Sequence, residues 1–526
     1  MSTSEPLRTA RGTGWTGGTG WTGGFVAGQL DVHIHSDPDS AVAVQDLVGL
    51  ALRRNPKRAH LLVSNVLAKH VPTEPALVIA AGTLLGAFVA RELSSSPNGT
   101  EPASCPGSMH DAGTSLPLEA ATAALTTALR SDGQDRVRAL AFLGDAVAGL
   151  GTRVPNAVVL GYAETATGLG RLVANALGAY YIHSTRHATP GIRAVAGFEE
   201  GHSHATSHAM VPTDPHWLDG DGPVVLVDDE FSTGSTVINT IRELHALVRH
   251  PVYVVAALID LRSAADRARF DALAAELGCR IAVTALGTGE ISLGDGILDR
   301  AAALIKALPH PPPATVDAGV GAAASGAPFP PAASGRLAML ELTEADMVPV
   351  RSDRFGNAAP PAEADIAAVA GHVATLLAAQ ECQGPFVVLG CEENMFLPLA
   401  AANVLAGLLP DAQVRFSTTT RSPIVPVDRD DYAISGALAF ASHDATLDGP
   451  GARFAYNLSG THGRPGTIVL FPEPGTGRRD VLARAPGAEL EPLAVAMATA
   501  ADDVVVVLLP ADLPPATSSN PAKDAP

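Results

Sequence analysis

The chain has 526 residues, of which 47% are hydrophobic, and its 35 basic and 54 acidic residues give a net charge of -19. This length predicts two or more domains, and the acidic balance argues against broad binding to nucleic acid, which needs clustered Lys and Arg. The first residues hold no apolar secretion signal, and no uninterrupted apolar run reaches the roughly 18 residues needed to cross a bilayer, so we expect a cytoplasmic protein that does not bind membranes.

Polar and Pro- or Gly-rich stretches divide the chain. Residues 1–24 contain two copies of TGWTGG and predict a flexible tail, whereas 94–115 interrupt apolar sequence and predict an exposed insertion. The stretch 309–335 predicts an interdomain linker, because its prolines disfavour both helices and paired strands. The expected domains are 25–308 and 336–510, followed by a disordered tail at 511–526.

Both expected domains alternate short apolar runs with longer helical patterns. In the first domain, strands are expected at 156–162, 223–229 and 252–260, with helices at 168–179 and 235–250. In the second, strands are expected at 385–391, 467–473 and 502–510, with a helix through 400–409. Strands that are apolar throughout and alternate with helices are typical of buried parallel sheets, so the predicted fold class is α/β, doubly wound in each half.

The segment VVLVDDEFSTGST at 224–236 carries the clearest chemical signal. Asp228 and Asp229 follow the apolar strand, at the edge where open α/β sheets bind ligands. Paired carboxylates suit ribose hydroxyls, directly or through a hydrated Mg²⁺. The loop that follows opens a helix and offers N–H groups and hydroxyls that suit a phosphate; it consists of Ser232, Thr233, Gly234, Ser235 and Thr236. The alternative is a helix N-cap beside two incidental acids.

This segment resembles the signature of the type I phosphoribosyltransferase family, which is an apolar strand, two acids and a small-residue loop of the form TGxT. The resemblance implies a Rossmann-like core and a glycosyltransferase that uses phosphoribosyl pyrophosphate and Mg²⁺. It further implies that Asp228 and Asp229 hold the ribose hydroxyls and the metal, and that 232–236 bind the 5′-phosphate.

A second strand-to-helix loop, GYAETATGLG at 161–170, is expected at the same sheet edge. In the resembled family this position cradles the pyrophosphate, partly through main-chain N–H groups. That family often places a basic residue nearby; this loop has none, which leaves Arg171 or Arg186 to neutralise the leaving group. The candidates within the loop are Ala163, Glu164, Thr165 and Thr167. The alternative is a plain turn between a strand and a helix.

The segment FEEGHSHATSH at 198–208 lies where the resembled family carries a mobile loop over the reacting centre. Closure of such a loop would exclude water from a reactive intermediate. His202, His204 and His208 could then assist departure of the pyrophosphate or proton transfer. A zinc site built on HxHxxxH and a plain surface loop are the alternatives.

Residues 416–424 read FSTTTRSPI. This motif resembles a bacterial arrangement in which a PRTase_2 domain precedes a C-terminal TRSP domain, a family associated with tellurium-resistance and stress operons. Arg421, with Thr420 and Ser422, offers a guanidinium and hydroxyls suited to a second phosphorylated ligand, with Glu393 as a further candidate. The alternative is that the arginine ties down a loop.

The two halves also resemble each other. The segment 158–177 can be laid on 387–405, which brings Glu164 onto Glu393, and 225–234 resembles 469–477, where the aspartate pair is absent. We therefore expect the second domain to be a diverged phosphoribosyltransferase-like copy, leaving one catalytic centre per chain. Chance similarity between strand-helix units is the alternative.

The sequence favours an enzyme that forms, or phosphorolytically cleaves, an N-ribosidic bond to an unidentified base or amine, and a homodimer is a plausible assembly. A sensor that binds the phosphorylated ribose without catalysis is the alternative function. The stretch DVHIH at 31–35 resembles the first metal motif of amidohydrolase barrels, but an alternating strand accounts for it.

Overall fold

The computed structural model describes residues 20–514 apart from 56–57, 96–114, 190, 193, 200–206, 309–334, 444–445, 447–450 and 485–488. Nearly all of the expected N-terminal tail, insertion and linker, and most of the C-terminal tail, thus lie outside the described residues. The last helix before the linker ends at Ala307, and the first strand after it begins at Arg336.

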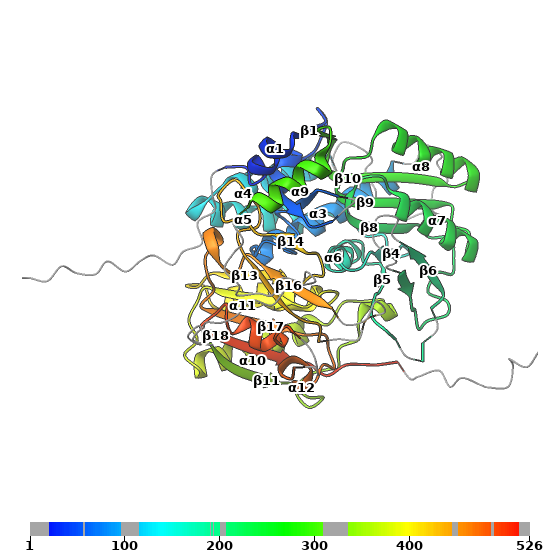
Figure 1. The fold of residues 1–526 in the computed structure, drawn as a ribbon. Helices are drawn as coiled ribbons and strands as arrows, with labels where there is room; N and C mark the ends of the chain where they lie inside the picture. Colours follow the sequence, from blue (N-terminus) through cyan, green and yellow to red (C-terminus); the bar gives the residue numbers. More distant parts are fainter. Residues whose placement is uncertain are drawn as a thin grey trace, which may run out of the picture.

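The first domain is built on a six-stranded sheet in the order β1-β10-β9-β8-β4-β5 (Figure 1). Neighbouring strands are parallel except β1, which pairs antiparallel with β10. The predicted parallel sheet is therefore confirmed, with one antiparallel edge strand added. The strands are β1 (Val32–Ser36), β4 (Val158–Gly161), β5 (Tyr180–His183), β8 (Val224–Phe231), β9 (Val252–Asp260) and β10 (Arg280–Leu293).

Helices cover both faces of this sheet because its central strands are apolar on both sides. On β8, Val225 and Val227 belong to the core formed with α3 and α6, whereas Val224 and Leu226 belong to the core formed with α7 and α8. The helices of this domain are α1 (Gly24–Leu30), α2 (Val44–Leu47), α3 (Pro75–Ser94), α4 (Ser115–Arg130), α5 (Gly133–Ala148), α6 (Thr167–Leu177), α7 (Ser235–Leu247), α8 (Ala264–Leu277) and α9 (Ile297–Ala307).

Helix α3 is the one helix, among the residues described, that is long and apolar enough to cross a membrane by length and composition. Thr83 interrupts its apolar residues, which is why a count of uninterrupted residues passes over it. Most of the helix is buried, and it packs on α4, α5, α6, β9 and β10. Its place in the core therefore accounts for its apolar composition.

The second domain is built on a five-stranded parallel sheet in the order β11-β18-β17-β12-β13. Its strands are β11 (Arg336–Glu341), β12 (Phe386–Gly390), β13 (Val414–Thr418), β17 (Thr467–Phe471) and β18 (Asp503–Leu508). Its helices are α10 (Glu363–Ala379), α11 (Phe396–Leu408), α12 (Arg478–Leu482) and α13 (Leu493–Met497). The first two helices belong to the core on one face of the sheet, and the last two to the core on the other.

Four strands of each sheet follow the same topology. In the first domain, β4, β5, β8 and β9 lie side by side as β9-β8-β4-β5, and in the second the corresponding order is β18-β17-β12-β13. The next place is filled by β10, which follows these strands in the chain, and by β11, which precedes them. Different strand orders would have contradicted the idea of a diverged copy; the shared order supports it.

The two domains are joined through helices and through a shared sheet. Helix α11 packs on α3 and α6, and Leu172 of α6 belongs to the core of the second domain. A small antiparallel sheet, β14-β2-β3, combines β2 (Val48–Arg53) and β3 (His60–Ser64) with β14 (Ile424–Val425). Figure 1 shows β14 between the two halves, and its pairing with β2 brings residues that are distant in sequence together there.

Each domain also carries a two-stranded hairpin. The first is formed by β6 (Ala196–Glu199) and β7 (Ser207–Met210), and the second by β15 (Ala437–Ala441) and β16 (Ala452–Tyr456). In each case the hairpin forms one bridge to the loop after the edge strand, Thr185 to Ala209 and Thr420 to Phe454. The hairpins are thus a further feature that the two halves share.

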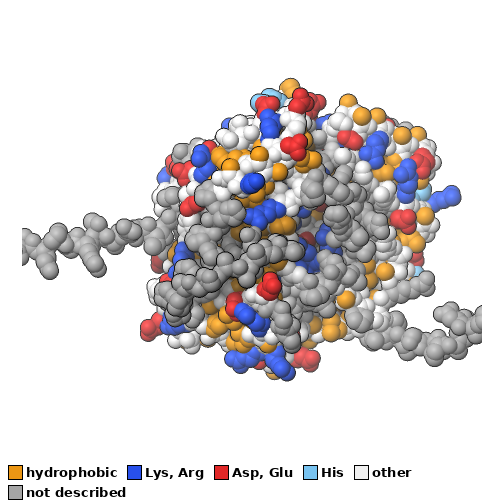
Figure 2. Space-filling model, viewed as in Figure 1, with side chains coloured by type: hydrophobic (Ala, Val, Ile, Leu, Met, Phe, Trp, Pro, Cys, Tyr) orange, Lys and Arg blue, Asp and Glu red, His pale blue; other side chains and the backbone are white. Residues whose placement is uncertain are grey.

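Charged side chains of both signs are interspersed on the face shown in Figure 2. Exposed ion pairs such as Arg242–Glu276 and Arg429–Asp431 bring opposite charges together. Within the described part of this face there is no extended basic stripe of the kind that nucleic acid binding requires.

A buried ion pair between the domains gives the first prediction. Arg171 Nε donates to Asp353 Oδ2 at 3.0 Å, and the arginine side chain is fully buried. We expect Arg171→Met to lower the free energy of unfolding by about 3–5 kcal/mol, because it removes the fully buried cation that pairs with the largely buried carboxylate of Asp353. Urea denaturation measures the loss; Arg242→Met, which breaks an exposed pair, is the control and should change stability little. A comparable loss in the control would contradict the prediction.

Candidate functional site

The two acids lie near the carboxyl end of β8, which continues to Phe231. Asp228 Oδ1 accepts a hydrogen bond from the backbone N–H of Asp229 at 3.0 Å. Both side chains are partly exposed, whereas the four residues before them are buried. The strand therefore presents two adjacent carboxylates at the edge that the sequence predicted.

The predicted phosphate loop forms the N-terminus of α7. Gly234 adopts the left-handed conformation with φ of 68°, and the helix starts at Ser235. The hydroxyls of Thr233 and Ser235 lie 3.2 Å apart. The first N–H groups of a helix lack partners within it, so this end can bind an anion beside the two acids.

A basic residue from the β2–β3 hairpin reaches this loop. Arg58 Nη2 donates to Ser232 Oγ at 2.6 Å, and Arg58 Nη1 donates to Glu230 Oε1 at 3.4 Å. Sequence reasoning missed Arg58, which lies more than 170 positions before the loop. Its signal was the group of arginines at 53, 54 and 58.

A second missed cation, Lys69, serves the loop at 162–166. Lys69 is buried, and its Nζ donates to Thr165 Oγ1 at 2.5 Å. It therefore supplies the positive charge that the loop sequence lacks. Of the two arginines expected in that role, Arg171 instead pairs with Asp353 and stacks on the Tyr181 ring. Arg186 donates to His208 Nε2 at 3.1 Å and also acts electrostatically on Glu164 of the loop.

The loop between β4 and α6 is tied down by its own domain. The Ala163 N–H donates to Ser184 Oγ at 3.0 Å, and the peptide bond after it is cis. Thr167 is buried at the start of α6, where its hydroxyl donates to Glu164 O at 3.3 Å. Thr165 links this loop to Lys69, which lies elsewhere in the first domain.

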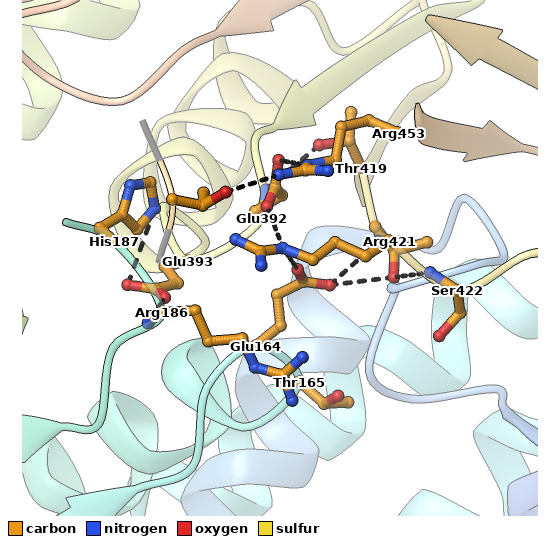
Figure 3. A network of polar contacts seen from close by, with 12 residues as sticks. Glu164, Thr165, Arg186, His187, Glu392, Glu393, Thr419, Arg421, Ser422 and Arg453 are labelled. Atoms are coloured by element: carbon orange, nitrogen blue, oxygen red, sulfur yellow. Dashed lines mark hydrogen bonds and ion pairs between the residues drawn. The ribbon is translucent and has the colours of Figure 1, made fainter. Parts of the chain in front are cut away.

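The side chain of Glu164 reaches the second domain (Figure 3). Its Oε2 accepts hydrogen bonds from Thr420 Oγ1 at 3.0 Å and from the Arg421 N–H at 3.3 Å, and its Oε1 lies 3.0 Å from Arg421 Nε. We call this group, Glu164 with Thr420 and Arg421, the Glu164 clamp. Burial alone would raise the pKa of the Glu164 carboxyl, but Lys69, Arg421 and Arg186 outweigh that effect and hold the pKa below its ordinary value.

Glu393 makes the reciprocal contact from the second domain. It accepts hydrogen bonds from Thr185 Oγ1 at 2.6 Å and from the Arg186 N–H at 2.7 Å. We call this group, Glu393 with Thr185 and Arg186, the Glu393 clamp (Figure 3). Burial opposes ionisation, but His187 and Arg354 lower the pKa of Glu393 to about 2. The expected correspondence of Glu164 and Glu393 thus has a structural counterpart. Each carboxylate binds the loop that follows the edge strand of the other domain, β13 for Glu164 and β5 for Glu393.

The edge strands repeat this reciprocity. Tyr181 of β5 exchanges two backbone hydrogen bonds with Asn357 of the second domain, each of 2.9 Å. Phe416 of β13 does the same with Thr73 of the first domain, at 2.8 and 2.9 Å. Each domain therefore forms a backbone bridge to an edge strand of the other sheet.

The second domain differs at the position of the two acids. Gly161 pairs with Val227 in the first sheet and Gly390 with Phe471 in the second, so Pro472 and Glu473 follow where Asp228 and Asp229 stand. Glu473 forms an ion pair with Arg354. The cavity beside it has a volume of about 40 Å³ and is lined by residues that include Asp353, Glu393 and Glu473.

Of the three candidate histidines, only His208 is described. It lies on β7, is buried, and its Nδ1 is 3.0 Å from Ser184 Oγ. The segment predicted as a loop begins and ends in the strands of a hairpin; His202 and His204 lie outside the described residues. Among the described residues no group of three or more His, Cys, Asp or Glu side chains is placed to hold a metal ion.

Comparison with known families assigns both halves. Residues 47–290 match the PRTase_2 family of phosphoribosyl transferases, and residues 351–483 match the TRSP domain found C-terminal to PRTase_2. The chain belongs to this phosphoribosyltransferase family. A PRTase_2 domain followed by a TRSP domain is the architecture that the motifs predicted.

Solved structures of adenine phosphoribosyltransferases show limited similarity to this family member. The enzyme from Trypanosoma brucei, in complex with AMP, pyrophosphate and ribose-5-phosphate, is 18% identical with a TM-score of 0.21, over 27% of this chain and 60% of its own. The enzyme from Leishmania tarentolae is 17% identical with a TM-score of 0.20, over 32% of this chain and 75% of its own. This chain thus spans less than two thirds of the Trypanosoma enzyme. No curated protein matches it.

The left-handed glycine in the phosphate loop gives the second prediction. A Cβ on Gly234 would lie 2.6 Å from the Phe270 ring, whereas a Cβ on Gly278, which has nearly the same φ, meets open space. We expect Gly234→Ala to weaken binding of ribose 5-phosphate about tenfold or more, since the loop must shift away from the ring. Gly278→Ala carries the same backbone strain and should leave binding unchanged. Isothermal titration of both variants tests this; equal affinities would contradict it.

Proposed function

We propose that this enzyme transfers the phosphoribosyl group of phosphoribosyl pyrophosphate, with Mg²⁺, to a nitrogen atom of a base or amine. The observation that carries the proposal is the juxtaposition of Asp228 and Asp229 with the N-terminus of α7 and the guanidinium of Arg58. Acids for a ribose, N–H groups for a phosphate and a nearby cation together match a phosphorylated sugar.

Different residues would bind the two phosphorylated ends of the substrate. The loop 232–236 and Arg58 would bind the 5′-phosphate, and Lys69 and the loop 162–166 would face the pyrophosphate. Asp228 and Asp229 fit Mg²⁺, which prefers oxygen ligands and often keeps several waters, because both are partly exposed and adjacent. When bound, the metal supplies charge neutralisation for the leaving pyrophosphate.

The chain's own residues would act mainly by position and charge. The nitrogen nucleophile forms a bond to C1 of the ribose while the bond from C1 to the pyrophosphate oxygen breaks, and the pyrophosphate leaves with that electron pair. Cations fixed where this negative charge develops stabilise the transition state without having to rearrange. The reverse reaction, attack by pyrophosphate on a nucleotide, uses the same contacts.

Turnover distinguishes this proposal from a sensor that only binds the sugar phosphate. Pyrophosphate release would be measured with phosphoribosyl pyrophosphate, Mg²⁺ and a panel of nucleobases and amines. Release with at least one acceptor supports transfer and identifies the acceptor class. Tight binding without release on any acceptor would favour the sensor.

The two acids give the third prediction. Replacing both, Asp228→Asn with Asp229→Asn, should weaken Mg²⁺-dependent binding of phosphoribosyl pyrophosphate at least about tenfold, since charged ligands to the metal and ribose are lost. The control replaces two exposed acids near the other end of the same strand, Asp219→Asn with Asp221→Asn. This control changes the net charge equally and should bind as the wild type does. Unchanged binding by the first variant would refute the assignment.

Glu230 gives the fourth prediction, a dependence on pH. Burial, and then Asp229, raise the pKa of Glu230 to about 7. Below that pH the folded protein holds the carboxyl neutral; above it, a third negative charge forms beside the phosphate loop. Affinity for phosphoribosyl pyrophosphate should therefore fall as the pH rises through 7, and more steeply in the wild type than in Glu230→Gln.

The same group predicts the direction of a stability change. Because the folded protein binds this proton more tightly than the unfolded chain, Glu230 makes the protein less stable as the pH rises from 4.5 to about 7. For the binding prediction, the affinity for phosphoribosyl pyrophosphate would be measured between pH 6 and 8 with the wild type and with Glu230→Gln. Ionisation of the ligand affects both proteins equally, so a difference between their profiles reports on Glu230. Parallel pH profiles for the two proteins would show that Glu230 is not responsible.

A further inference from the structure

The segment that carries the TRSP motif, residues 418–425, lies against the first domain rather than around a site of its own. We call it the TRSP segment. On one side it contacts the loop 162–166, which we call the pyrophosphate loop, through Glu164. On the other side it adds strand β14 to the β2–β3 hairpin. Figure 3 shows Arg421 and Ser422 beside Glu164, with Glu392 on the opposite side of the Arg421 side chain.

The contact with the hairpin connects the TRSP segment to the phosphate end of the proposed site. Ile424 pairs with Arg53 of β2, and the N–H of Arg54 donates to Pro423 O at 3.4 Å. The same hairpin carries Arg58, which donates to Ser232. The TRSP segment thus supports the element that brings a cation to the 5′-phosphate loop.

The contact with Glu164 brings positive charge to the pyrophosphate loop. Arg421 Nε lies 3.0 Å from Glu164 Oε1 and 2.8 Å from Glu392 Oε2, and the arginine side chain is 11% exposed. The cations acting on Glu164 are Lys69, Arg421 and Arg186. Arg421 is shared between Glu164 and Glu392, while Lys69 and Arg186 add two further positive charges near the loop carboxylate, which suits a pyrophosphate.

Arg421 is not among the residues that line the cavity at the equivalent position of the second domain. The residues that line this cavity include three acids, Asp353, Glu393 and Glu473, and one arginine, Arg351. Arg354 in that region is already paired with Glu473. A phosphorylated ligand would therefore meet more acids than arginines there.

We propose that the TRSP segment completes the transferase site of the first domain, with Arg421 as a positioning residue that acts through Glu164. Arg421 fixes the pyrophosphate loop and adds positive charge behind it, and Thr420 shares in holding Glu164. The second domain is therefore a permanent non-catalytic half of the enzyme, and the motif serves the donor substrate instead of a second ligand. This inference rests on the proposed function.

A comparison of two ligands tests the inference, because they share the ribose 5-phosphate and differ in the pyrophosphate. The dissociation constants of phosphoribosyl pyrophosphate and of ribose 5-phosphate would be measured with Mg²⁺ for the full chain. We expect Arg421→Ala to weaken binding of phosphoribosyl pyrophosphate about tenfold to a hundredfold while leaving ribose 5-phosphate almost unaffected.

Arg453 provides a matched control. It is also buried and its Nε lies 2.6 Å from Glu392 Oε1, but the carboxylate it contacts belongs to the second domain. Arg453→Ala removes a buried arginine from the same cluster, so we expect it to retain the preference for phosphoribosyl pyrophosphate over ribose 5-phosphate. Loss of that preference in both variants would overturn the specific role of Arg421.

The remaining outcomes separate this inference from the proposed function. If the wild type binds neither ligand, the proposed function itself fails. If the wild type binds both and Arg421→Ala keeps the same preference, or loses both ligands equally, the role of Arg421 is overturned. Should the alanine variant not fold, Arg421→Lys keeps the charge but cannot reproduce the guanidinium contacts; an intermediate preference supports the inference, and an unchanged one overturns it.

Discussion

The buried carboxylate of Glu164 sets the constraint on which the relation between the two domains depends. A carboxylate removed from water is stable only with hydrogen bonds and opposite charge close by. Part of what Glu164 needs comes from Lys69 in its own domain, and part from Thr420 and Arg421 in the other. Glu393 of the second domain depends in the same way on Thr185 and Arg186 of the first. Separating the domains would therefore leave both carboxylates without these partners.

This reciprocity gives the second domain a structural role that does not depend on a pair of aspartates of its own. Both sheets share the order of four strands. The loop after β4 and the loop after β12 are each held by hydrogen bonds from the other domain. The first domain keeps Asp228 and Asp229, whereas the second has Pro472 and Glu473 there, with Glu473 paired to Arg354. The second domain therefore contributes structure and charge to the interface in place of a second set of acids.

The positive charges in the site come from distant parts of the chain. The loop at 162–166 carries an acid and no base, so its positive charge comes from the segment before α3, through Lys69, and from the second domain, through Arg421. The phosphate loop draws Arg58 from the β2–β3 hairpin. The domains and the hairpin must therefore assemble before the site has the positive charge that the proposed substrate, with two phosphorylated ends, would require.

The sequence by itself determined the features that depend on neighbouring residues: the alternating strands and helices, the acids at the end of β8, and the glycine that starts α7. Each follows from local patterns of hydrophobicity and backbone preference. It did not reveal Arg58, Lys69 or the destination of Glu164, because these contacts join segments between 96 and 257 positions apart. Which cations meet which carboxylates was decided only by the packing of two sheets, since the pairing energy depends on burial and distance, and neither is fixed by the order of residues.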